Sequence, residues 1–81
     1  MKALLIVDVQ NDFCAGGALP APDGDKIIPT INNLAKQFDV VLASRDDHPA
    51  ESDHFKKWPV HCVTGSEGAK FHPDLDTSNI K

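Results

Sequence analysis

The chain has 81 residues, enough for one small domain. Apolar residues make up 41% and charged residues 25%, proportions that exclude a fibrous or largely disordered chain. Twelve acidic residues against eight basic ones give a net charge of −4 without a basic stripe, so nucleic-acid binding is not expected. The longest apolar run, residues 3–7, is too short for a membrane span or a secretory signal. Two cysteines do not make a disulfide framework, which favours a reducing, cytoplasmic location.

The first half of the chain predicts a strand, a helix and a second strand. Residues 3–7 form a continuous apolar run, which is typical of a parallel strand buried on both faces. From Asp25 to Phe38 apolar residues recur every three or four positions, which predicts a helix with Asp25 as N-cap and Pro29 in its first turn. Residues 40–44 form a second apolar run. Strand, helix and strand within about 40 residues predict a βαβ unit with parallel pairing.

The region after the second strand has the spacing of a metal site. Its pattern D-x-H-x5-H-x6-H comprises Asp46, His48, His54 and His61. In an extended chain Asp46 and His48 point to the same side, and the two later histidines lie in a loop that is able to fold back. One carboxylate and three imidazoles suit one divalent transition metal (Zn, Fe or Mn) and not Ca or Mg. Because the spacing is not a zinc-finger pattern, a polar loop with scattered histidines remains the alternative.

Asp8 directly follows the first apolar run. Sites in open parallel sheets form outside the carboxyl ends of the strands, and Asp8 and Asp46 follow two strands that should be neighbours. Asp8 is therefore a candidate general base or orienting carboxylate beside the metal. The alternative is an acid that caps the loop amides of Gln10 and Asn11.

Two aromatic residues and two cysteines are the remaining candidates. Phe13 and Trp58 lie near the expected site in sequence and could form the walls of a pocket for a flat ring, although packing in the core or a loop explains them equally well. Cys14 and Cys62 lack the helix N-terminus or cationic neighbour that lowers a thiol pKa. They are expected to be small buried residues, with nucleophile or ligand as the alternative.

Five short motifs extend over nearly the whole chain: D-V-Q-N-D-F at 8–13, S-R-D-D-H at 44–48, D-H-F at 53–55, W-P-V-H-C-V-T-G at 58–65 and G-A-K-F-H-P at 68–73. Together they resemble the amino-terminal portion of nicotinamidases, also called pyrazinamidases, of the isochorismatase-like cysteine hydrolase family. The first motif is shared across that family, and the histidine set with W-P-x-H-C is more specific to nicotinamidases. The resemblance implies an α/β fold with a three-layer parallel sheet. Residues 1–81 would be the amino-terminal part of a single domain, with the first βαβ unit and the metal loop.

The resemblance also implies an activity and roles for individual residues. Members of this kind hydrolyse an aromatic amide such as nicotinamide to the acid and ammonia through a cysteine thioester. Asp8 would take the thiol proton, and the metal would hold the ring nitrogen of the substrate. The implied metal ligands are Asp46, His48 and His61, with His54 a ligand in some members, and the implied ring walls are Phe13 and Trp58.

The family's catalytic lysine and nucleophilic cysteine come from later segments than those in this chain, so the chain alone is expected to be inactive. The alternatives are a non-catalytic metal-binding or interaction module and a related amide hydrolase. Two strands and one helix leave one sheet face open. The chain is therefore expected to need the carboxyl-terminal part of its domain or a second copy, and a homo-oligomer is expected.

Overall fold

The computed structural model describes residues 1–81 as two strands, one α-helix and four short 3₁₀ turns. In chain order the elements are β1 (Ala3–Val7), η1 (Asn11–Phe13), η2 (Gly24–Ile27), α1 (Ile28–Ala35), β2 (Val40–Ser44), η3 (Asp53–Lys56) and η4 (Glu67–Ala69). Both strands have the bounds that the apolar runs predict. None of the helices has the length and apolar character to span a membrane.

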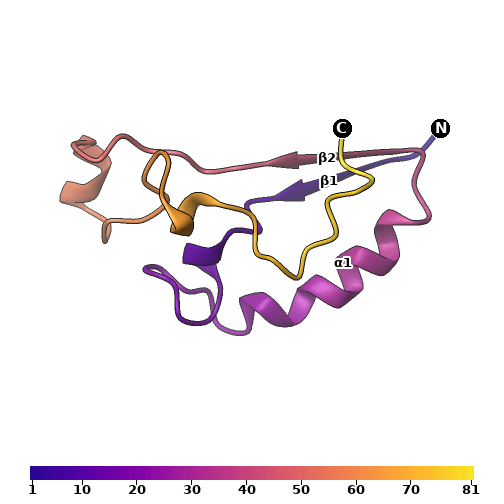
Figure 1. The fold of residues 1–81 in the computed structure, drawn as a ribbon, viewed down its shortest axis with the longest axis horizontal. Helices are drawn as coiled ribbons and strands as arrows, with labels where there is room; N and C mark the ends of the chain where they lie inside the picture. Colours follow the sequence, from indigo (N-terminus) through magenta and orange to yellow (C-terminus); the bar gives the residue numbers. More distant parts are fainter.

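The two strands pair in parallel, as a βαβ unit requires. Their register runs from Ala3 opposite Val40 to Val7 opposite Ser44, so the carboxyl ends of both strands meet at one edge. In Figure 1 helix α1 lies along one side of the strands, and the C-terminal segment (yellow) passes beside the helix before returning to the strands. Ile80 forms a parallel bridge with Val41 at the end of this segment.

The helix is shorter than its apolar pattern predicts. The prediction of a helix from Asp25 to Phe38 with Asp25 as N-cap is wrong, because residues 24–27 form the 3₁₀ turn η2 and the α-helix covers only residues 28–35. An α-helical bond to the Asp25 carbonyl would need an amide hydrogen at position 29. Pro29 has none, so the amide of Ile28 donates to that carbonyl instead and the turn remains 3₁₀.

The hydrophobic core lies between α1 and one face of the sheet. Its buried members from the strands, the helix and the following segments include Ile6, Val41, Ile28, Ala35 and Leu75. On the other face the alternate strand positions remain open. Leu5 and Val7 are each 62% exposed and Leu42 is 44% exposed, because no element of residues 1–81 packs there. The apolar runs predict that both faces of the sheet are buried, but the elements of residues 1–81 cover only one face.

Candidate metal centre

Three histidines converge in the region that follows β2. One ring nitrogen of each of His48, His54 and His61 lies within 4.8 Å of those of the other two. The rings of His48 and His54 are stacked with centroids 4.4 Å apart, and the His61 ring stands edge-on to His48 at 5.1 Å. The structure therefore brings together the three histidines of the predicted ligand set.

Asp46 joins this cluster through its carboxylate. Its Oδ1 lies 2.9 Å from Nε2 of His48, and its Oδ2 lies 3.2 Å from Nε2 of His61. One carboxylate thus faces two of the three imidazoles from the end of β2. The structure thus brings Asp46 to His48 and His61, and His54 joins the cluster through the other two histidines.

The protonation of His61 indicates what the cluster can bind. Its Nδ1 lies 2.7 Å from the Pro59 carbonyl oxygen, a contact that requires the proton on Nδ1. In the neutral ring Nε2 then presents a lone pair to the Asp46 carboxylate, so two acceptors face each other unless a proton or a cation lies between them. Nε2 of His48 is buried and lies 2.9 Å from Asp46 Oδ1, but the geometry of that contact is not that of a hydrogen bond. Free imidazole nitrogens around one carboxylate are a donor set that fits a first-row divalent metal.

The backbone holds the cluster through pairing between distant segments. His48 forms a parallel bridge with Val63, in which its amide donates to the Cys62 carbonyl and its carbonyl accepts from the Thr64 amide, both at 2.9 Å. His54 lies in η3, whose N-cap Ser52 accepts a hydrogen bond from the His54 amide at 3.2 Å. His48 and His54 are therefore held by backbone hydrogen bonds of their own, and His61 directly precedes Cys62, whose carbonyl accepts the bond from His48.

Asp8 lies at the carboxyl end of β1 in a left-handed conformation, with φ of 57°. Its Oδ1 accepts a hydrogen bond of 3.0 Å from the Ser44 hydroxyl at the end of β2. The alternative prediction, that its carboxylate caps the following loop amides, is wrong. The Gln10 amide donates to the backbone carbonyl of Asp8, and the Asn11 amide donates to the Lys70 carbonyl.

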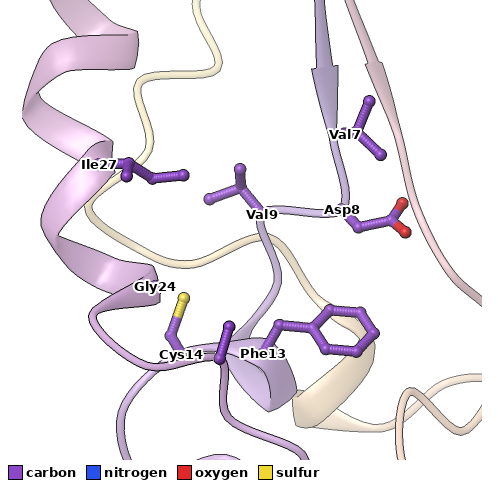
Figure 2. Close-up of a pocket in the computed structure, with 8 residues that line it drawn as sticks. Val7, Asp8, Val9, Phe13, Cys14, Gly24 and Ile27 are labelled. Carbon is purple, nitrogen blue, oxygen red and sulfur yellow. The ribbon is translucent and has the colours of Figure 1, made fainter.

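A pocket of about 160 Å³ lies beside Asp8, separate from the histidines. Most of its lining is apolar and includes Val9, Phe13, Cys14 and Ile27. Figure 2 shows the Asp8 carboxylate and the Phe13 ring on the same side, turned away from Ile27 and Cys14.

The two predicted aromatic walls have different positions. The Phe13 ring connects the pocket to the cluster, since its centroid lies 5.5 Å from that of His61. Trp58 does not line the pocket. It is 52% exposed and stacks on His54 at 6.1 Å, at the outer side of the cluster.

Comparison with known proteins identifies the family. Residues 2–79 match the family model described as the isochorismatase domain. The chain belongs to the isochorismatase domain family. It is 45% identical to the nicotinamidase/pyrazinamidase of Mycobacterium tuberculosis over 91 aligned positions, which cover 100% of this chain and 49% of that protein. The chain thus spans about half the length of the curated relatives it matches.

Solved structures give the same result. The pyrazinamidase of Pyrococcus horikoshii in complex with zinc is 43% identical, with a TM-score of 0.84, and the match covers 96% of this chain and 48% of that one. PnC1 from L. infantum in complex with nicotinate is 37% identical, with a TM-score of 0.93, over 98% of this chain and 43% of that one. The isochorismatase-like fold that the motifs imply is confirmed.

Neither cysteine of this isochorismatase-domain chain has the environment of a nucleophile. Cys14 is 3% exposed and Cys62 is 0% exposed. Burial, together with the nearby charge of Asp25, raises the pKa of Cys14. Burial, together with the carboxylates of Asp46 and others, raises the pKa of Cys62 to about 12. A nucleophilic thiol needs a lowered pKa, so both cysteines are the small buried residues that the sequence predicts.

Two residues that hold this site were missed by sequence reasoning. Gln10 and Asp12 each bind backbone groups of the metal loop through their side chains. Their partners lie 36 and 50 residues away in sequence, so no local pattern of residues could indicate them.

Proposed function

We propose that residues 1–81 form the amino-terminal part of an isochorismatase-like domain that holds one divalent metal ion and hydrolyses nicotinamide or a similar aromatic amide. The observation that carries this proposal is the convergence of three histidine nitrogens within 4.8 Å of one another, two of them facing the Asp46 carboxylate. Relatives named as nicotinamidases, and a pyrazinamidase in complex with zinc, support it. The protein would act in the cytoplasm on a small-molecule amide.

The residues would divide the work as follows. Asp46, His48 and His61 would hold the metal, with His54 as a further ligand, and the bound ion would supply a Lewis acid that orients the substrate ring. Asp8 at the end of β1 would accept a proton, and the rings of Phe13 and Trp58 would contact the substrate ring.

The chemistry would be that of a thiol amidase. A cysteine thiol gives its proton to Asp8, and its sulfur attacks the carboxamide carbon to form a thioester with release of ammonia. Water then cleaves the thioester to the acid and regenerates the thiol. Because Cys14 and Cys62 are buried with raised pKa values, we propose that the nucleophile lies outside residues 1–81. Phe13 would flank the substrate ring from the Asp8 side, and Trp58 from the His54 side.

Metal titration tests the ligand assignment. We expect Zn²⁺ or Co²⁺ to bind with one ion per chain, and the binding isotherm to be lost in Asp46→Ala and in His48→Ala. His72→Ala is the matched control. His72 is the one histidine outside the cluster, and its Nδ1 accepts a hydrogen bond from the Asp74 amide. Metal binding by both ligand variants at the affinity of the unaltered chain would show that the assignment is wrong.

A second candidate function is a metal-binding or interaction module without catalysis, which the burial of both thiols in residues 1–81 favours. The decisive measurement is ammonia release from nicotinamide and from other amides by the protein expressed from its complete reading frame. We expect activity that is lost in Asp8→Ala, whereas Cys14→Ala and Cys62→Ala keep it if they fold. Metal binding without amide hydrolysis would favour the module, and preference for another amide would favour a related hydrolase.

A further inference from the structure

Gln10 makes an unusual set of contacts for a residue that follows a strand. Its side chain is fully buried, at 0% exposure. Its Oε1 accepts a hydrogen bond from the Asp46 amide at 2.8 Å, and its Nε2 donates to the Asp46 carbonyl at 2.8 Å and to the Ala69 carbonyl at 2.7 Å. The carboxamide therefore binds both polar groups of the Asp46 backbone, as a neighbouring strand would, beyond the end of the regular sheet.

Asp12 makes the corresponding contact with the segment that carries His61. Its Oδ2 accepts a hydrogen bond from the Cys62 amide at 2.7 Å, and its Oδ1 accepts one from the Ala18 amide at 3.1 Å. Cys62 has φ of 47°, a conformation that costs a non-glycine residue energy and persists only when its surroundings enforce it. Asp12 is thus bound to the backbone at the left-handed residue directly after His61.

Gly68 lies directly against the Asp12 carboxylate. A Cβ atom built on Gly68 would collide with both carboxylate oxygens of Asp12. Gly68 also provides the carbonyl that faces the Cys62 sulfur at 4.0 Å. The carboxylate could yield to a side chain at position 68 only by giving up its bonds to Ala18 and Cys62.

From these contacts we propose that Gln10 and Asp12 are positioning residues for the metal site, which set the separation of the Asp46 carboxylate from the His61 ring. Both come from one short segment, η1 and the residue before it. This segment therefore binds the backbone at Asp46 and the backbone directly after His61. Metal sites tolerate errors of about 0.2 Å in ligand distance, so a loosened Asp46 or His61 weakens binding without removing any ligand. This inference rests on the proposed metal-binding function.

The test uses the protein expressed from its complete reading frame, with Zn²⁺ and Co²⁺ as probes. We expect Gln10→Ala, Gln10→Glu and Asp12→Ala to weaken Zn²⁺ binding by about 10–100-fold, the range for loss of a group that orients a metal ligand. We also expect them to alter the visible absorption of bound Co²⁺, which reports ligand geometry. In Gln10→Glu a carboxylate oxygen replaces the amide NH2 group, so an acceptor faces the carbonyl oxygens of Asp46 and Ala69 in place of a donor.

Asn32→Ala is a matched control. Asn32 lies on α1, away from the cluster, and its carboxamide makes the same kind of clamp: it donates to the Asp74 carbonyl at 2.9 Å and accepts from the Asp76 amide at 2.9 Å. Its loss should lower thermal stability without changing the affinity for Zn²⁺ or the Co²⁺ spectrum. Gly68→Ala displaces the Asp12 carboxylate and removes no hydrogen-bonding group, so it should weaken Zn²⁺ binding like Asp12→Ala.

The outcomes separate the two proposals. If the unaltered protein binds neither ion, the metal-binding function fails and this inference fails with it. If the unaltered protein binds metal, and the folded Gln10→Glu and Asp12→Ala variants bind with unchanged affinity and spectrum, the positioning role is overturned while the metal site stands. If Asn32→Ala weakens binding as much as the Gln10 variants do, the effect is one of general stability and the inference is likewise overturned.

Discussion

The open sheet face leads to a quantitative prediction about stability. Three side chains on that face are largely exposed to solvent: Leu5 at 62%, Val7 at 62% and Leu42 at 44%. Complete burial of one such side chain is worth about 1.5–3 kcal/mol, so covering the remaining surface of all three would add roughly 2.5–5 kcal/mol. The whole net stability of a domain is about 5–15 kcal/mol. We therefore expect residues 1–81, expressed alone, not to unfold as an independent cooperative monomer.

Two experiments check this expectation. Thermal and urea melts of the 81-residue polypeptide over a range of concentrations should give a transition that depends on concentration, with association visible by sedimentation. In the protein expressed from its complete reading frame, the double substitution Leu5→Thr and Leu42→Thr should cost roughly 2–4 kcal/mol if the face is covered there. Threonine is β-branched and keeps the preference for a strand. Val60→Thr, at a 57% exposed position outside the sheet, is the control and should change little.

One combination of results would refute the reasoning. It is a sharp, concentration-independent transition from a sedimenting monomer of 81 residues, together with an unchanged free energy of unfolding in the double variant of the complete protein. The open face would then be an ordinary solvent-exposed surface, and residues 1–81 would be a self-sufficient module.

The other predictions concern the core and the thiols. Ile28→Ala should lower the free energy of unfolding by about 2–5 kcal/mol in urea melts, because Ile28 is 1% exposed in the core under the sheet; a loss below about 1 kcal/mol would contradict that packing. Cys14 and Cys62 should resist alkylation in the native state at pH 8 and react after unfolding, and rapid native labelling would contradict their burial. Burial raises the pKa of the Cys62 thiol from its ordinary value of 9.0 to about 12. The stabilisation of the fold by the protonated thiol should therefore be complete below about pH 9 and be lost as the pH rises towards 12. Melts across that pH range would show the loss.

The secondary structure was predictable where local patterns determine it. The two apolar runs gave the strand bounds because β-branched and aliphatic residues without polar alternation suit a buried parallel strand. The helix was overestimated because its apolar spacing continues to Phe38, which still packs against the core from outside the helix. Hydrophobic spacing indicates which residues face the core. It does not show where α-helical hydrogen bonds stop, and here Pro29 decides the start.

The convergence of the candidate metal ligands was predictable in part for a related reason. Asp46 and His48 directly follow a strand, and imidazole and carboxylate groups at such positions have few roles other than binding or chemistry. The alternation of an extended chain then places them on one side. The approach of His61 was less certain from the sequence, because it depends on a loop returning 15 residues later to bring its ring to the same carboxylate.

The left-handed residues show why the positioning contacts escape prediction from sequence. Asp8, with φ of 57°, ends the alternation of β1, so the side chains of Val9 and Gln10 are both buried although they are consecutive. Cys62 makes a similar change of direction after His61. Residues with positive φ close to Gln10 and His61 thus interrupt the strand periodicity from which the supporting contacts could have been inferred.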